Sequence, residues 1–506
     1  MTSTTDSPSS ARKLARRTLL RHGAAVPVAV GLGAALVSGI GIGVPSMWGD
    51  EAASVMSAQR PWDSLWAMAA NIDAVHTMYY ALLHLWIDAF GASAFAVRLP
   101  SALAVGVAVS GVFTLCRMLS EARLAFIASI ACVLLPRFGF MAAETRSAAL
   151  SAALMTWLTV LLVHLVRSRE LRLRWWVLYG VVLVVSVHLF LYTALIAAVH
   201  LLTLLVLRAP RPVWWRWAWA TVLAGLACIP FALVASGQQG QIAFLARRDP
   251  KNPMAIFVHQ WFGALPIAVF AWILIIGAVA WAVTSRVRAP SREADADRRA
   301  LISIAAAWLM VPMLLLLLAD AVAGPLYTGR YLSFSAPAAG ILMGAAVSLV
   351  RPRPLAAVVG AVALLLTVPF AVSQRTENAK YGSDWAQVSA YVGARSQPGD
   401  GVVFDEGVRP SRKPRLALRL YPEGFRDTSD LGLVRSYEQT DGLWDVVKPL
   451  HELPGALDGR ERVWVIARSD EGTSDDERTL RRAGFRLVDT HWLSRDVILL
   501  YTKGTP

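Results

Sequence analysis

The 506-residue sequence contains few cysteines and few charged residues. Its three cysteines, Cys116, Cys132 and Cys228, all lie inside apolar runs, which indicates small core residues rather than a disulfide or metal framework. Only 17% of the residues are charged. The last 130 or so residues lack a Gly-rich phosphate loop, a catalytic-triad spacing and a metal-ligand cluster. No internal repeat is evident either. These absences argue against redox chemistry and against a repeat architecture.

Apolar residues are what the sequence has in abundance. They make up 56% of the chain, the mean hydropathy is +0.49, and the net charge is +14. Apolar runs of roughly 17–22 residues recur, which is the length that spans the hydrocarbon core of a bilayer. The arginines cluster in short links between these runs, as the positive-inside rule describes. The sequence therefore predicts a polytopic membrane protein in contact with lipid, with no nucleic-acid partner.

The apolar runs predict about eleven membrane-spanning helices. They cover residues 24–44, 99–115, 124–140, 147–166, two helices within 175–207, 217–235, 262–283, 300–322, 332–350 and 355–372. The run 175–207 is too long for one ordinary span and short for two. We divide it near His188 and Tyr192, because two helices return the chain to the cytoplasm at the arginines that follow. The N-terminus is then cytoplasmic and the C-terminus extracytoplasmic, in the plasma membrane.

The predicted fold is an all-α polytopic bundle with a small C-terminal α/β domain. Residues 1–23, Ser/Thr-rich and then basic, are predicted to be disordered in the cytoplasm. Residues 24–373 form the transmembrane domain, and 45–97 its first external loop, with interfacial helices. Residues 374–506 form an extracytoplasmic soluble domain. Periodicity predicts helices at 384–395 and 475–483 there, and strands at 401–404, 462–467, 485–489 and 497–502.

A polar stripe marks one helix of the first external loop. His76, Tyr80, His84 and Asp88 recur at every fourth position of an apolar and aromatic segment. A helix with this pattern lies in the membrane interface rather than crossing it. His84 and Asp88 are weakly placed to hold a divalent metal, and a solvated stripe is the simpler alternative. No cofactor is therefore assigned, and metal dependence stays open.

Two adjacent carboxylates, Asp50 and Glu51, lie where the first apolar run ends. A carboxylate costs about 2.5–3.5 kcal/mol or more at the bilayer centre, so this pair at a membrane face is either functional or part of a solvated helix cap. Other charged residues fall on the same predicted side. They are Arg98, Glu144, Arg146 and Arg330. The positive-inside rule leaves these external arginines unexplained, whereas an anionic, lipid-borne ligand at the outer leaflet explains them. Snorkelling or pairing with a carboxylate is the alternative for each one.

In residues 24 to about 350 the sequence resembles the C-type glycosyltransferases. The resemblance rests on Trp48-Gly49-Asp50-Glu51, Val97-Arg98-Leu99-Pro100-Ser101-Ala102, Glu144-Thr145-Arg146 and Gly329-Arg330-Tyr331-Leu332. The most similar branch is that of the protein O-mannosyltransferases and lipid A aminoarabinose transferases, glycosyltransferase family 39 and its relatives. The sequence departs from that branch at His76-Thr77, where relatives often have Lys-Pro-Pro, and at Glu144, where they often have Asp.

The resemblance implies transfer of a sugar, with inversion, from a polyprenyl phosphate to a hydroxyl on a glycan, glycolipid or protein. A phosphate leaving group needs no proton, so one base is sufficient. Asp50 is the implied base, and Glu51 the residue that orients the acceptor. The implied phosphate ligands are Arg98, Arg330 and Arg146, and the implied substrate-positioning residues are Glu144, His76, Tyr80 and Tyr331.

Other donors and other classes of function remain possible. The Ala/Arg/Val-rich composition is typical of a high-G+C bacterium, which favours mannose as the donor sugar, with arabinose as the alternative. A lipid-linked-sugar flippase would also have many helices, but it should carry a repeat and acidic sites near the midplane. A scaffold protein would explain the external domain but not the Asp50–Glu51 pair.

Overall fold

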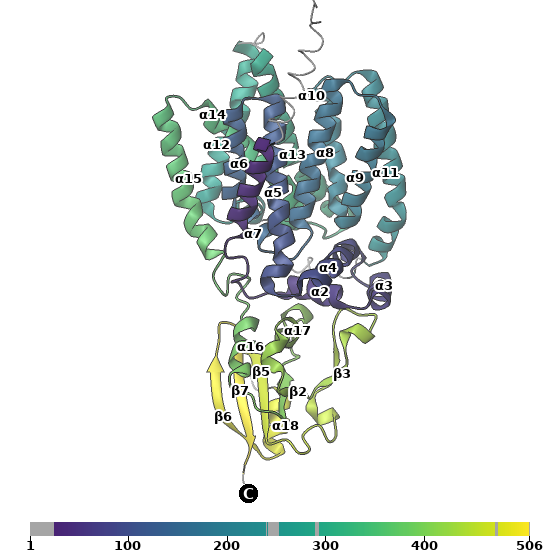
Figure 1. The fold of residues 1–506 in the computed structure, drawn as a ribbon, viewed down its shortest axis with the longest axis vertical. Coiled ribbons are helices and arrows are strands. Elements are labelled where there is room, and N and C mark those ends of the chain that lie inside the picture. Colours follow the sequence, from purple (N-terminus) through teal and green to yellow (C-terminus); the bar gives the residue numbers. More distant parts are fainter. Residues whose placement is uncertain (1–24, 239, 241–251, 289–292, 471–473, 505–506) are drawn as a thin grey trace, which may run out of the picture.

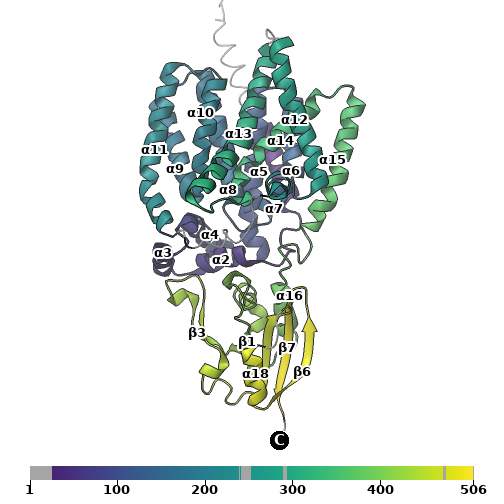
Figure 2. The ribbon, with the colours of Figure 1, turned by 180° about the vertical axis from the view of Figure 1, so that it is seen from behind.

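The computed structural model describes residues 25–238, 240, 252–288, 293–470 and 474–504, and the segment 1–23 lies outside these ranges. A bundle of long helices is joined at one end to a smaller domain built on a sheet, and short helices lie between the two (Figure 1). The view from behind shows the same arrangement (Figure 2). The chain is 69% helical. The predicted fold class, a helical bundle with a small α/β domain, is confirmed.

Among the described residues, seven helices are long and apolar enough to cross a membrane. They are α5 (Ala94–Leu119), α8 (Ala148–Ser168), α11 (Arg211–Gly237), α12 (Leu265–Arg288), α13 (Glu293–Ala323), η5 with α14 (Gly329–Leu349) and α15 (Arg353–Ser373). The pair α6 (Ala122–Leu134) and α7 (Pro136–Ala142), bent by 64°, passes the same test. Three shorter apolar helices are Ala25–Gly39, α9 (Leu173–Leu189) and η2 with α10 (Leu191–Val206).

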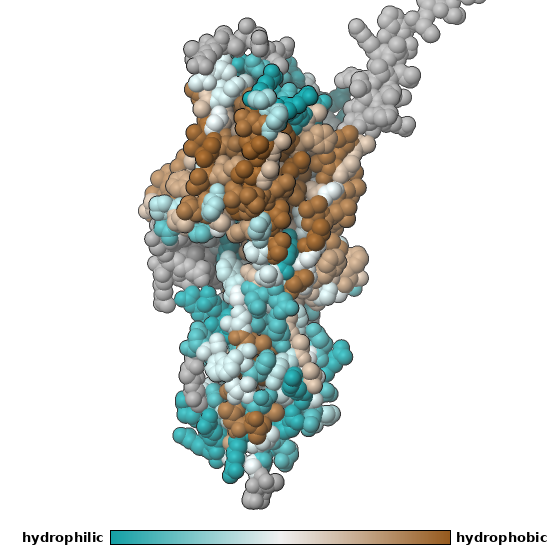
Figure 3. Space-filling view, turned by 90° about the vertical axis from the view of Figure 1, so that its left-hand side faces the viewer, coloured by the Kyte–Doolittle hydropathy of each residue, from teal (hydrophilic) through white to brown (hydrophobic). Residues whose placement is uncertain are grey.

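Each predicted span thus coincides with one apolar helical segment. Hydrophobic side chains dominate the face of the bundle seen in Figure 3. The protein is a multi-pass membrane protein. The break predicted between His188 and Tyr192 is present, because α9 ends at Leu189 and Phe190 is extended. The bend between α6 and α7 was not predicted. It follows from Pro136, which has no N–H for the helix ladder and starts α7 at its first position.

The first external loop is helical almost throughout. It contains α2 (Gly49–Gln59), α3 (Trp62–Asn71), η1 (Ala74–His76) and α4 (Thr77–Phe90). The helix predicted from the polar stripe corresponds to α4. The segment around Asp50 is the first turn of α2 rather than a cap, and Trp48 is the N-cap residue. Nearly every side chain of α2 is buried, since the helix lies between the bundle and the C-terminal domain.

The C-terminal domain is built on a five-stranded sheet with the order β2-β1-β5-β7-β6. The strands are β1 (Asp400–Phe404), β2 (Thr428–Asp430), β5 (Arg462–Arg468), β6 (Phe485–Trp492) and β7 (Asp496–Lys503), with a separate ribbon of β3 (Leu433–Arg435) and β4 (Val446–Val447). The helices are α16 (Trp385–Gly393), α17 (Leu416–Leu420) and α18 (Asp475–Arg482). All six predicted elements are present. The strands β2, β3 and β4 were missed because two or three residues carry no readable alternation.

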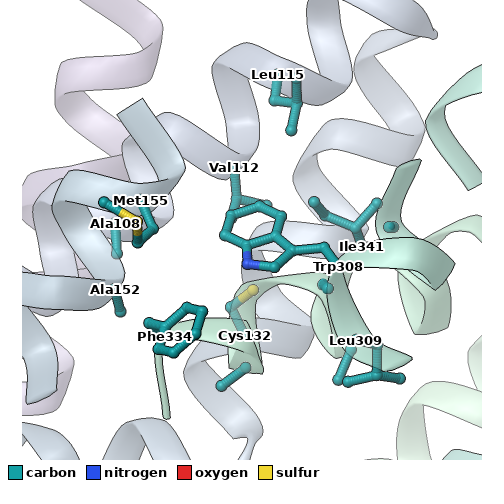
Figure 4. Packing of buried hydrophobic residues seen from close by; sticks show 14 of the residues in the cluster. Ala108, Val112, Leu115, Cys132, Ala152, Met155, Trp308, Leu309, Phe334 and Ile341 are labelled. Atoms are coloured by element: carbon teal, nitrogen blue, oxygen red, sulfur yellow. The ribbon is translucent and has the colours of Figure 1, made fainter. Parts of the chain in front are cut away.

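Close packing holds the bundle together. Trp308 of α13 lies among Val112 of α5, Cys132 of α6 and Ile341 of α14 (Figure 4). A Cβ atom at Gly340 would lie 2.2 Å from the Cys132 sulfur, so α14 and α6 approach closely through small residues. All three cysteines are free and buried, as predicted.

A second core joins the external helices to the C-terminal domain. It contains Met56 of α2 and Tyr80 of α4 together with Trp385, Leu416 and Trp464 of the C-terminal domain. The α2 helix is therefore fixed from both sides, which determines where its first turn points.

Candidate active site at the membrane boundary

A cavity of about 850 Å³ lies where α2, α7, η5 and the C-terminal domain meet. Its charged lining is mostly cationic. The charged lining residues are Asp50, Asp73, Arg137, Arg146, Arg330, Arg409, Arg412 and Arg495. Aromatic side chains of Trp48, Phe140, Trp261, Tyr381 and Trp444 form much of the remaining wall. This combination of apolar wall and convergent charge is typical of a site for an anionic ligand with an apolar part.

Asp50 faces this cavity and forms an ion pair with Arg330, with 2.6 Å between Oδ2 and Nη1. Their side chains are 28% and 30% exposed, and the Arg330 guanidinium lies 5.3 Å from the centre of the Trp48 ring. Burial alone would raise the pKa of Asp50, but the charges of Arg330 and Arg146 hold this pKa below its ordinary value. Asp50 is therefore ionised at neutral pH and able to accept a proton.

Glu51 points away from the cavity, because successive residues of a helix are about 100° apart. Both its oxygens accept from Arg98, at 2.7 Å from Nε and 2.6 Å from Nη2, and both side chains are fully buried. Arg98 Nη1 donates to the carbonyl oxygens of Ile42 and Pro45. Glu51 also accepts from the Thr145 N–H. The structure thus gives Arg98 and Glu51 protein partners only. Neither residue lines the cavity, and the roles expected from the sequence, phosphate binding by Arg98 and orientation of the acceptor by Glu51, stay predictions.

Arg146 reaches the cavity from the turn before α8, and its Nη1 donates to the Tyr80 hydroxyl at 3.2 Å. The same hydroxyl donates to Asp73. Asp73 has a left-handed backbone (φ 61°), a conformation that Asp tolerates better than most residues. Burial, followed by the charge of Arg146, lowers the pKa of His76 to about 4, so this imidazole is neutral. Of these predicted residues only Arg146 lines the cavity; Tyr80 lies behind it as its hydrogen-bond partner, and His76 lies next to Tyr80.

Glu144 and Tyr331 lie behind the cavity wall. Glu144 is buried, and burial raises its pKa despite the charges of Lys380 and Arg330. Tyr331 stacks on Tyr192 with 4.7 Å between ring centres, and Tyr192 belongs to the break between α9 and α10. Neither residue lines the cavity as described.

The sequence analysis missed Arg137 and Lys380, in addition to the cavity-lining arginines Arg409, Arg412 and Arg495 of the C-terminal domain. Arg137 of α7 lines the cavity, and its guanidinium donates to the carbonyl oxygens of Gln260 and His259 at 2.6 and 2.9 Å. Lys380 is buried, with its ammonium 3.8 Å from the centre of the Phe140 ring. Burial lowers the pKa of Lys380 to about 8, against the opposing charges of Glu144 and Glu51. A charge inside the apolar run 124–140 was the available signal for Arg137, whereas nothing in the sequence ties Lys380 to the site.

The His84–Asp88 pair is present, with 3.4 Å between Nε2 and Oδ2. His84 Nδ1 lies 2.7 Å from the Ala58 carbonyl oxygen, which fixes the proton on Nδ1. Across the described part of the chain, no three His, Cys, Asp or Glu side chains gather in a way that could hold a metal ion.

No family model and no curated protein sequence matches the chain. Solved structures do. ArnT from Cupriavidus metallidurans bound to undecaprenyl phosphate is similar at 15% identity and a TM-score of 0.56, over 94% of this chain and 97% of that one. The apo state of the same protein is similar at 14% identity and a TM-score of 0.57, over 95% of this chain and 98% of that one. The apo form of the oligosaccharyltransferase of Archaeoglobus fulgidus is similar at 11% identity and a TM-score of 0.51, over 87% of this chain and 69% of that one. The chain therefore has the C-type glycosyltransferase fold.

Proposed function

We propose that the protein is a membrane glycosyltransferase that moves a sugar from a polyprenyl phosphate to an acceptor hydroxyl, with Asp50 as the base. The observation that carries this proposal is the partly exposed ion pair between Asp50 and Arg330 on the cavity wall. The reaction needs a group that accepts the proton of the acceptor hydroxyl and a group that stabilises the leaving phosphate. The ionised carboxylate of Asp50 can do the first, and the guanidinium of Arg330 can do the second. The similarity in fold to ArnT, whose structure holds undecaprenyl phosphate, supports the same class of donor.

In this proposal Arg330 has two tasks. Only its Nη1 is used by Asp50, and no further hydrogen bond of its guanidinium is recorded among the described residues. Its Nε and Nη2 are free to bind a phosphate oxygen in the planar geometry that arginine provides. Arg146 and Arg137 line the same cavity and add positive charge for the phosphate. Arg330 would thus hold the leaving group while keeping Asp50 ionised and oriented.

The reaction then proceeds in one displacement. The acceptor oxygen attacks the anomeric carbon, the bond from that carbon to the phosphate oxygen breaks, and its electron pair stays on the phosphate. The hydroxyl proton passes to Asp50. The phosphate leaves as a stable anion without a proton, so no second carboxylate is required, and attack opposite the leaving group gives inversion.

A second, apolar cavity supports a lipid donor. It has about 390 Å³ and lies between α6, α12, α14 and α15. Leu364 of α15 lines it, whereas Phe370 of the same helix lines the charged cavity. Six residues of helix correspond to roughly 9 Å, so an isoprenoid chain can extend from one cavity towards the other. We assign the phosphate to the charged cavity and the start of the lipid chain to this apolar one.

The orientation in the membrane follows from charge. The basic links lie at the end of the bundle away from the sheet domain, where Arg167 pairs with Asp297 and Arg298 pairs with Glu121. By the positive-inside rule that end is cytoplasmic, so the cavity and the C-terminal domain are extracytoplasmic.

The test is transfer by the purified protein in lipid nanodiscs, supplied with one radiolabelled polyprenyl-phosphate sugar at a time and with membrane extract as acceptor. Mannose is the first donor to try and arabinose the second. We expect labelled product with one donor and its loss in Asp50→Asn. The matched control is Asp63→Asn, which removes the same charge from an exposed position of α3. Transfer by Asp50→Asn at the wild-type rate would contradict the base assignment. A protein that moves the intact donor across the bilayer without cleaving it would be a flippase instead.

A further inference from the structure

The C-terminal domain contributes three arginines to the wall of the charged cavity. Arg409 precedes the short turn η6 (Pro410–Arg412), Arg412 is its last residue, and Arg495 lies in the turn between β6 and β7. The turn η6 packs directly on the start of α2. A Cβ atom at Gly49 would lie 2.0 Å from the Ser411 carbonyl oxygen. These arginines are therefore next to Asp50 in space, although more than 350 residues separate them in sequence.

The three arginines lack strong partners. Nε and Nη2 of Arg495 are buried without a hydrogen bond, its side chain is 11% exposed, and the nearest carboxylate oxygen, of Asp496, is 3.7 Å away. Arg409 and Arg412 are exposed, and no side-chain ion pair is recorded for either within the described ranges. The guanidinium of Arg495 keeps this long ion pair with Asp496 and the face of the Trp385 ring, 4.8 Å away. Its unsatisfied buried N–H groups are costly unless a ligand supplies acceptors.

The charge of the cavity exceeds what the donor requires. Six arginines and two aspartates line it. A sugar joined to a polyprenyl phosphate is a phosphodiester with one negative charge, and Arg330, Arg146 and Arg137 are already available to it. The arginines of the C-terminal domain enter the cavity from a different part of the chain, beside the start of α2. This surplus of positive charge calls for a second anion.

We infer that Arg409, Arg412 and Arg495 bind a phosphate group of the acceptor. This inference rests on the proposed function and specifies its acceptor as a lipid whose headgroup carries both a phosphate and the reacting hydroxyl. An arginine guanidinium can donate two parallel hydrogen bonds to phosphate oxygens. Such bonds to the acceptor phosphate would fix the position of its hydroxyl relative to Asp50. The exposed Trp62 and Trp66 of α3, at the same level of the molecule, mark the membrane interface where such a headgroup lies.

The experiment measures binding rather than turnover. The full-length protein in detergent is saturated with undecaprenyl phosphate to fill the donor site, and three probes are then titrated by native mass spectrometry. The probes are dioctanoyl-phosphatidylglycerol, glycerol phosphate and uncharged dioctanoylglycerol. The variants are Arg409→Gln/Arg412→Gln and Arg495→Gln. The control is Arg482→Gln, an exposed charge on α18 at the far end of the domain.

We expect the wild type and Arg482→Gln to bind phosphatidylglycerol at least tenfold more tightly than dioctanoylglycerol. Each cavity variant should lose about tenfold in affinity for phosphatidylglycerol alone, as expected when charge-assisted hydrogen bonds to phosphate are removed. Equal binding of phosphatidylglycerol by the cavity variants and Arg482→Gln would overturn the inference. Equal affinity for glycerol phosphate and the lipid would replace the lipid acceptor by a soluble phosphate compound. Because this assay needs no turnover, its outcome is independent of the Asp50→Asn test.

Discussion

The two ion pairs of α2 have the same chemistry and opposite surroundings. Glu51 and Arg98 are fully buried, form two parallel hydrogen bonds and tie the first turn of α2 to α5. Asp50 directly precedes Glu51 in the sequence. It shares one hydrogen bond with Arg330, and this second pair faces an open cavity. The buried pair is fully enclosed by protein and does not line the cavity. The open pair has unused donors and room beside it. Adjacent carboxylates can thus divide into a structural and a reactive one, because a helix turns them to different sides.

The largest expected effect is on stability, from removing one charge of each pair in turn. Glu51→Gln leaves Arg98 charged and without its carboxylate in a buried site, which costs about 3–5 kcal/mol. Asp50→Asn leaves Arg330 in contact with solvent and should cost less than about 1 kcal/mol. Thermal unfolding in detergent, followed by intrinsic fluorescence, measures both. An equal loss of stability in Glu51→Gln and Asp50→Asn would contradict the difference in burial between the two ion pairs.

The next effect is on the pH dependence of stability, and it comes from Lys380, which is buried like the Glu51–Arg98 pair. Its pKa of about 8 in the folded protein lies below the 10.5 of an exposed lysine. Between these values the unfolded chain holds one more proton, so stability rises with pH over this window, by about 3 kcal/mol at most. We expect Lys380→Met to be at least as stable as the wild type at pH 7 and to lack this rise. Melting temperatures from pH 7 to 10.5 test it, and a rise that persists in Lys380→Met would assign it to another group.

A smaller effect is expected from Arg330→Lys on the open side. Lysine retains the charge for Asp50 but is a point charge without a planar fork, so it cannot hold Asp50 and a phosphate together. The KM for the donor should rise about tenfold, with little change in melting temperature. Arg460→Lys, at a half-buried arginine of the C-terminal domain that does not line the cavity, is the matched control. An unchanged donor KM would remove Arg330 from the phosphate site.

The smallest effect is expected when the buried pair is replaced as a whole. Glu51→Leu combined with Arg98→Met leaves no unpaired charge, and such replacements of buried pairs are often neutral. The Thr145 N–H loses its acceptor, so a loss of about 1 kcal/mol remains. The double variant should therefore melt well above Glu51→Gln, and a double variant as unstable as Glu51→Gln would show that Arg98 stabilises through its contacts to Ile42 and Pro45.

Part of the site was readable from the sequence. The carboxylate pair, Arg146 and Arg330 follow apolar runs, and hydropathy places them at one membrane face. Their pairing was not readable. Whether Arg98 meets Asp50 or Glu51 depends on the rotation of α2, which its contacts with the C-terminal domain determine. The arginines of η6 and of the β6–β7 turn lie in a region whose sequence indicated only a small α/β fold.

The sequence by itself determined the apolar helical segments, the break at Phe190 and four of the five strands of the C-terminal sheet, because hydrophobic length and periodicity are local properties. Only the tertiary structure decided which charged side chains are buried and which line the cavity. It also decided that α2, α7, η5 and the C-terminal domain share that cavity. The physical reason is that burial and charge pairing depend on residues distant in sequence, and these meet only when the bundle and the domain pack against α2.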